Sequence, residues 1–148
     1  MKGPKIAIVA SRFNQKVTDR LLESCLRILS EHGFGESRVF VARVPGAFEI
    51  PWTAQELALS GKFGAIIALG AVIRGQTAQN DYIARSVIEQ LHVVSIITRV
   101  PCLLGVIAPN NEAQALARTR GSLDRGKEAA LAAIEILALK LPTHHGKT

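Results

Sequence analysis

Apolar residues recur along the chain with two different spacings. The run KIAIVA (5–10) is unbroken and rich in β-branched residues, as is typical of a strand buried on both faces of a parallel sheet. In the next segment, VTDRLLESCLRILSEHGF, apolar residues recur at helical spacing, and Gly33 is suited to end the helix. The chain therefore begins with a predicted strand followed by a predicted helix.

Strands and helices continue to alternate over the rest of the chain. Between 92 and 108 two apolar runs, VVSIIT and LLGVIA, flank Pro101, and we expect extended structure from His92 onward that includes the fourth strand. The other expected elements are a strand at 37–44, a helix opened by 46–51 and running to Ser60, a strand at 64–73, a helix from about Thr77 to Leu91, and final helices from Asn111 and Ser122. This order implies parallel βαβ units with right-handed crossovers. The predicted fold class is α/β, a three-layer αβα sandwich of flavodoxin-like type with a four-stranded parallel sheet.

Length and composition restrict the class of protein. The chain has 148 residues, of which 48% are hydrophobic and 20% charged, so we expect one globular domain over 1–148 with a disordered tail from about 141 to 148. No apolar stretch approaches the roughly 20 residues of a membrane helix, and the N-terminus lacks the cleavage site of a signal peptide. We therefore expect a cytoplasmic protein without a membrane partner.

Charge and cysteine usage exclude further classes. The net charge of +6 comes from scattered lysines and arginines without interleaved aromatic residues, which favours ordinary surface charge and binding of small anions over binding of nucleic acid. Cys25 and Cys102 lie in apolar surroundings without motif spacing. We expect two free thiols and no metal site.

The segments that follow the predicted strands are the candidates for chemistry. In parallel α/β sheets, ligands bind beyond the carboxyl ends of the strands, where backbone amides and helix N-termini are free. Those segments are SRFN, PGAFE, GAVIRGQT and IAPNN.

The segment GAVIRGQT is not a nucleotide-binding loop, because the Lys-Ser/Thr pair that such a loop needs is missing after Gly75. Gly75, Gln76 and Thr77 precede a predicted helix, where free N–H groups and a hydroxyl could bind one phosphate. Alternatively, Gly75 provides a turn and Thr77 caps the helix. An arginine from elsewhere in the chain would favour the phosphate.

Two of the few aromatic residues follow predicted strands directly. Phe13 and Phe48 could stack on a planar heterocycle, or they could cover the edge of the core. Glu49 could favour the helix dipole, or its carboxylate could accept hydrogen bonds from the hydroxyls of a ligand.

The segments IVASRFN, VPGAFEIP, GAVIRGQTAQNDYIA and PxxxGV, with a basic C-terminal helix, resemble those of the 6,7-dimethyl-8-ribityllumazine synthase family over residues 4 to 139. The resemblance implies condensation of 5-amino-6-ribitylaminouracil with 3,4-dihydroxy-2-butanone 4-phosphate, without cofactor or metal. It also implies sites between adjacent subunits of a homopentamer, with icosahedral shells of twelve pentamers in some members and riboflavin synthase as a candidate partner.

The resemblance also assigns substrate-binding roles by position. Phe13 would stack on the pyrimidine with Asn14 nearby, Ala47, Phe48 and Glu49 would hold the ribityl chain, Val72 and Ile73 would contact the ring through their backbone, and Gln76, Thr77 and Arg118 would bind the phosphate. Arg118 is an arginine from elsewhere in the chain, and it favours the interpretation of this loop as a phosphate site because a guanidinium group binds phosphate well.

The match is incomplete at the residue expected to carry protons. Gln79 stands where the family has a histidine, and glutamine cannot act as a general base. Glu128 matches the carboxylate that orients this histidine, Arg125 replaces a lysine that meets the pyrimidine, and Leu104 replaces an aromatic residue. None of the histidines at positions 32, 92, 144 and 145 restores the missing group. We expect a slow synthase, and the alternative is a non-catalytic homologue that binds ribityl heterocycles or forms a shell.

Overall fold

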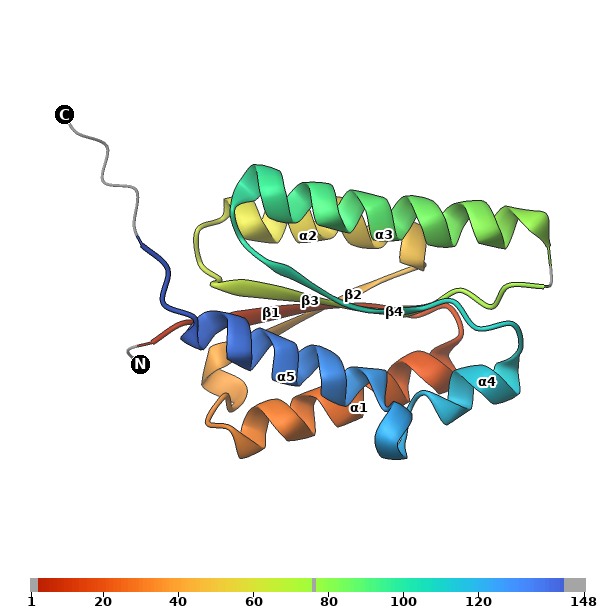
Figure 1. The fold of residues 1–148 in the computed structure, drawn as a ribbon, viewed down its shortest axis with the longest axis horizontal. Coiled ribbons are helices and arrows are strands. Elements are labelled where there is room, and N and C mark those ends of the chain that lie inside the picture. The colour runs from red at the N-terminus through yellow and green to blue at the C-terminus, as the bar shows by residue number, and fades with distance from the viewer. Residues whose placement is uncertain (1–2, 76, 143–148) are drawn as a thin grey trace.

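A four-stranded parallel sheet forms the centre of the molecule (Figure 1). The computed structural model describes residues 3–75 and 77–142. The strands are β1 (Ile6–Ser11), β2 (Val39–Val44), β3 (Ala65–Ala71) and β4 (Cys102–Ile107), in the order β2-β1-β3-β4. All three strand pairs are parallel, so the predicted sheet is confirmed.

Helices cover both faces of the sheet and complete three layers (Figure 1). One face carries α2 (Ile50–Leu59) and α3 (Ala78–Thr98), and the other carries α1 (Gln15–Glu31), α4 (Glu112–Ala117) and α5 (Arg125–Ala138). Short 3-10 turns, η1 (Glu36–Arg38), η2 (Ala47–Glu49) and η3 (Gly121–Leu123), stand before β2, α2 and α5. The chain is thus an α/β sandwich of flavodoxin-like type, as predicted.

The core lies on the two sides of β1, whose residues are all buried. Ala7 and Val9 pack with residues of α2 and α3, whereas Ile6 and Ile8 pack with residues of α1 and α5. This is the alternation of side chains expected for a strand, with both faces apolar because helices cover both. Burial of each large aliphatic side chain contributes roughly 1.5–3 kcal/mol, which is why an unbroken apolar run predicts this position in the sheet.

The expectation of extended structure from His92 was wrong. Helix α3 continues through the segment VVSIIT to Thr98, and the chain turns at Arg99, which has a φ of 63°. Leu91 and Val94 continue the buried face of the helix, so packing overrides the weak preference of β-branched residues for strands. Only the second apolar run, after Pro101, forms a strand.

The C-terminal tail expected to be disordered falls largely on 143–148, which lie outside the described residues. Leu141 and Pro142 are exposed and have no regular secondary structure. Within 3–75 and 77–142, no helix combines the length and the apolar character needed to cross a bilayer.

The close crossing of α1 and α5 leads to a stability prediction. A Cβ atom at Gly126, in the first turn of α5, would overlap the carbonyl oxygen of Leu21 in α1. Alanine favours helix by about 1 kcal/mol over glycine, but overpacking against a backbone group costs about 1–3 kcal/mol or more. We expect Gly126→Ala to lower Tm by about 4 °C or more, measured calorimetrically at one fixed protein concentration.

Gly35→Ala is the matched control for this substitution. Gly35 has an ordinary φ of −81°, and nothing lies within 4 Å of a Cβ atom built there. The Tm of the Gly35→Ala variant should therefore stay within about 1 °C of the wild-type value. Equal Tm values for the two variants would mean that α1 and α5 are not packed as closely as the structure has them.

Candidate active site

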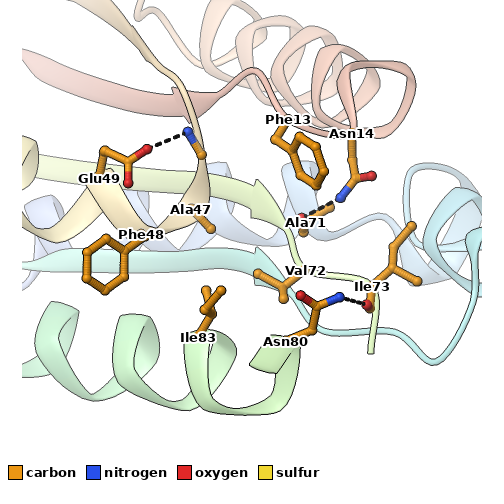
Figure 2. Close-up of a pocket in the computed structure, with 11 residues that line it drawn as sticks. Phe13, Asn14, Ala47, Phe48, Glu49, Ala71, Val72, Ile73, Asn80 and Ile83 are labelled. Carbon is orange, nitrogen blue, oxygen red and sulfur yellow. Dashed lines mark hydrogen bonds between the residues drawn. The ribbon is translucent and has the colours of Figure 1, made fainter. Parts of the chain in front are cut away.

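A cavity of about 140 Å³ lies at the carboxyl ends of β1 and β3, beside η2 and the first turns of α3 (Figure 2). This is the edge of a parallel sheet at which ligands are expected to bind. The cavity is lined by Phe13, Asn14, Gly46, Ala47, Phe48, Glu49, Ala71, Val72, Ile73, Asn80 and Ile83. Seven of the residues predicted to bind substrate are therefore together in one place: Phe13, Asn14, Ala47, Phe48, Glu49, Val72 and Ile73.

The two phenylalanines are largely exposed at this cavity. The exposed fractions are 70% for Phe13 and 66% for Phe48, so neither ring is buried as part of the core. Backbone N–H groups of Arg12 and Phe13 donate to the carbonyl oxygens of Val44 and Pro45, at 2.8 and 2.9 Å, and so attach the segment after β1 to the end of β2. The arrangement leaves ring surface available for stacking on a planar ligand.

Asn14 and Glu49 fix the backbone on two sides of the cavity. Asn14 has a left-handed backbone with a φ of 60°, and its Nδ2 donates to the carbonyl oxygen of Ala71 at 2.9 Å (Figure 2). The carboxylate of Glu49 accepts a hydrogen bond from the backbone N–H of Gly46 at 3.0 Å. One carboxylate oxygen thus stabilises the loop, and the half-buried group retains further acceptor capacity for ligand hydroxyls.

The segment after β3 offers two backbone groups to a ligand. The N–H of Val72 donates to the Ile107 carbonyl at 2.9 Å, and the carbonyl of Ile73 accepts from Asn80 at 2.7 Å. The Val72 carbonyl and the Ile73 N–H make no such backbone hydrogen bond with the described residues. A contact of these two residues with a ring would use those two groups.

An ion pair closes the loop that contains the predicted phosphate site. Nε of Arg74 lies 2.7 Å from a carboxylate oxygen of Asp81. The hydrogen bond to Asp81 raises the pKa of Arg74, and the charge of Asp81 acts in the same direction. The backbone also contributes, because Arg74 N–H donates to the carbonyl of Pro109 at 2.7 Å.

Within this loop, Gln76 lies outside the described residues. Thr77 occupies the N-cap position of α3, but its exposed side chain makes no capping hydrogen bond. The structure thus has the turn at Gly75, with a φ of 88°, and Thr77 at the cap position, without the side-chain hydrogen bond of a cap. Its hydroxyl stands at the positive end of a long helix, where an anion is favoured.

The remaining predicted residues do not line the cavity. Leu104 is 49% exposed on β4, which is an edge strand, and Arg118 is half-buried at the end of α4. Arg125 donates to the carboxylate of Glu128 at 2.9 Å, and its backbone N–H bonds to the Arg118 carbonyl at 2.8 Å. We call the four predicted residues that lie away from the cavity the distal residues: Leu104, Arg118, Arg125 and Glu128.

Gln79 does not line the cavity either, although its neighbour Asn80 does. Gln79 is exposed in the first turn of α3, and Asn80 is half-buried. Each residue along a helix is rotated by about 100° from the previous one, so the side chains of Gln79 and Asn80 point in different directions. Sequence reasoning missed Asn80 because the resemblance directed attention to the histidine position.

No cysteine or histidine of the described residues lines this cavity. Burial raises the pKa of the Cys25 thiol to about 12, with a smaller effect from the charge of Asp124, and burial also raises the pKa of Cys102. Both cysteines are free thiols, as predicted. His32 and His92 are exposed on or next to helices, and His144 and His145 lie outside the described residues.

The described residues also contain no group of three or more histidine, cysteine or acidic side chains that could hold a metal ion. The residues that line the cavity offer aromatic surface for stacking and polar groups for hydrogen bonding.

Comparison with known families adds a match that covers almost the whole chain. A family model described as 6,7-dimethyl-8-ribityllumazine synthase matches residues 3–140. The chain belongs to this family. The lumazine synthase family acts in riboflavin biosynthesis as a transferase. Three of the segments that carried the resemblance, those after β1, β2 and β3, contribute residues to the lining of the cavity.

Proposed function

We propose that the chain is a 6,7-dimethyl-8-ribityllumazine synthase that condenses 5-amino-6-ribitylaminouracil with 3,4-dihydroxy-2-butanone 4-phosphate. The observation that carries this proposal is the pair of exposed rings, Phe13 and Phe48, on a cavity that also contains Glu49. A stacking surface suits the planar pyrimidine, and a carboxylate acceptor suits the hydroxyls of the ribityl chain. Membership of the lumazine synthase family supports the same substrates.

The phosphate of the second substrate would bind at the start of α3. The Thr77 hydroxyl makes no capping hydrogen bond with the described residues, Gln76 precedes it in the chain, and the helix N-terminus favours an anion. Arg118 would supply the guanidinium, because its side chain makes no hydrogen bond or ion pair with the described residues. An unpaired, half-buried arginine is available to bind an external anion.

We further propose that each site is shared between two subunits of a homopentamer. The cavity has a volume of about 140 Å³, whereas pockets that bind small molecules usually have volumes of roughly 300 Å³ or more. One chain would therefore enclose only part of the substrates. The distal residues Leu104, Arg118 and Arg125 would approach the cavity of the neighbouring subunit and complete it. Larger icosahedral assemblies and association with riboflavin synthase would build on this pentamer.

The proposed reaction needs proton transfers but no redox step. The 5-amino group attacks the ketone carbon, and a first water leaves to form an imine. Phosphate is then eliminated, and tautomerisation leaves a carbonyl group on the four-carbon unit. The ribityl-bearing nitrogen attacks this carbonyl carbon, and a second water leaves as the second ring closes. Gln79 cannot carry a proton, so water, the substrate phosphate or Glu128 would do so. Orientation of two reactants can contribute more to the rate than a general base, which typically contributes about 10²- to 10⁴-fold.

The proposal predicts slow but measurable product formation. Purified protein mixed with both substrates should form the fluorescent lumazine faster than the same mixture without protein, with release of one phosphate per product. The matched control is a mixture that contains the Phe13→Ala variant, which should be slower because stacking on the pyrimidine is lost. Rates equal to the protein-free background would contradict the synthase.

The exposed, non-titrating Gln79 favours a second candidate, a homologue that binds ribityl heterocycles without reaction. Calorimetry with 5-amino-6-ribitylaminouracil separates the two candidates. Tight binding together with background rates of product formation would support the binding protein.

A further inference from the structure

Asn80 is the polar side chain that α3 contributes to the cavity. It lies in the first turn of the helix and lines the cavity together with Val72 and Ile83. Neither the resemblance nor membership of the family gives this residue a role. Because the neighbouring walls are apolar, an amide group here is unusual and calls for a hydrogen-bonding partner.

The orientation of the Asn80 amide is fixed by the backbone. Its nitrogen lies 2.7 Å from the carbonyl oxygen of Ile73. A carbonyl oxygen can only accept a hydrogen bond, so the atom facing it must be the donor Nδ2. Figure 2 shows the amide nitrogen turned to Ile73 and the oxygen turned the opposite way, toward the side of Val72 and Ile83. Asn80 therefore presents an oriented acceptor, Oδ1, to the cavity.

On the proposed function, this acceptor lies close to the atoms of the two substrates that react with each other. Asn80 lies one turn of helix from Thr77, and its cavity also contains the Phe13 ring. On the proposed function, the phosphate of the ketone lies at Thr77 and the pyrimidine lies on Phe13. The atoms that join, the exocyclic amine and the ketone carbon, must then lie between these two residues.

We propose that Oδ1 of Asn80 accepts a hydrogen bond from the 5-amino group of the pyrimidine substrate. This inference rests on the proposed function and adds a substrate-binding residue to it. An amide acceptor binds one N–H without taking up the proton, so the lone pair of the amine points away from Asn80 and toward the ketone. The contact would also select pyrimidines that carry an amine at this position.

A pair of ligands tests the contact directly. The probes are 5-amino-6-ribitylaminouracil and 6-ribitylaminouracil, which differ only in the amine. In calorimetry, the wild-type protein should bind the pyrimidine with the amine roughly 3- to 10-fold more tightly than the pyrimidine without it. This ratio of dissociation constants corresponds to the usual net contribution of one hydrogen bond. In Asn80→Leu, of similar size but without an acceptor, the preference should fall to about one.

This ratio separates a contact with substrate from a purely structural role. Loss of the bond to Ile73 alone would weaken binding of both ligands equally and leave the preference unchanged, and that result would overturn the proposal. If Asn80→Leu does not fold, Asn80→Ala gives the same comparison. The control is Thr98→Val, which removes a hydrogen bond of 2.7 Å to Val94 in the same helix and should keep the full preference.

The outcome for Asn80 can be distinguished from the outcome for the proposed function. Product formation with a preference that Asn80→Leu leaves intact would refute the Asn80 contact alone. A preference that Asn80→Leu abolishes, in a protein that forms no lumazine, would support the contact and refute the synthase. Failure of both ligands to bind would refute both.

Discussion

Replacing Gln79 with histidine should raise the rate of lumazine formation by about 10- to 100-fold. The wild-type residue can orient a group by hydrogen bonding, but it cannot exchange a proton near neutral pH. Gln79 is exposed in the first turn of α3, so an imidazole there needs no rearrangement of the core. The expected gain lies at or below the lower end of the range of about 10²- to 10⁴-fold for general acid–base catalysis, because the groups around the new imidazole have not been adapted to it.

The pH profile of this variant gives an independent readout. The wild-type rate should be nearly flat between about pH 5.5 and 7.5, whereas Gln79→His should show a step near the ordinary histidine pKa of about 6.5, with the higher rate on the alkaline side where the imidazole is neutral and can accept a proton. Gln90→His is the matched control, because Gln90 is also exposed and lies on nearly the same face of α3. An unchanged rate and a flat profile for Gln79→His would mean that proton transfer does not limit this enzyme.

Most of the fold could be predicted because its two central strands are buried on both faces. The β1 and β3 strands are completely buried, and a helix that packs on a sheet has one apolar stripe, so the two spacings in the sequence differ clearly. The segment VVSIIT was misassigned because all its residues except the serine are β-branched, which is typical of a strand. Ile96 and Ile97 are 70% and 72% exposed on α3, so their apolar character in the chain does not reflect burial within it.

The candidate site could be predicted only in part, for a related reason. Residues directly after strands, such as Phe13 and Phe48, meet at the sheet edge because topology alone brings them there. The role of Asn80 depends on the rotation of the first turn of α3, and a shift of one residue in the start of the helix would have turned Gln79 inward instead. Of the distal residues, Leu104 lies on β4 and the others lie beyond this strand. No local pattern in the sequence predicts which cavity they would complete.

Replacing Arg118 with alanine should lower kcat/KM for the ketone phosphate by about 100-fold, or roughly 2.7 kcal/mol, since a phosphate would lose its charged hydrogen-bonding partner. The calorimetric affinity for the pyrimidine alone should change less than about twofold, because that substrate has no phosphate. Arg118→Lys should recover part of the loss, as lysine keeps the charge without the planar fork.

The control for Arg118 is Arg120→Ala. Arg120 is exposed and lines a separate cleft with Arg20 and Arg27 of α1, so its loss should leave kcat/KM within about twofold. A similar loss in Arg118→Ala and Arg120→Ala would indicate a general effect of positive charge on the approach of the anion. That effect would disappear at high salt, whereas loss of a direct contact would persist.

Mixing two impaired variants, Phe13→Ala and Arg118→Ala, tests whether Arg118 acts on the cavity of a neighbouring subunit. Phe13→Ala damages the cavity of its own chain, and Arg118→Ala damages the group that the chain would give to its neighbour. Unfolding and refolding the two together in equal amounts should restore roughly one quarter of the wild-type activity, because a quarter of the adjacent pairs then combine an intact cavity with an intact arginine. If Phe13 and Arg118 serve the same cavity within one chain, every chain carries one lesion and no activity returns. The recovered fraction thus decides between a shared site and a site within one subunit.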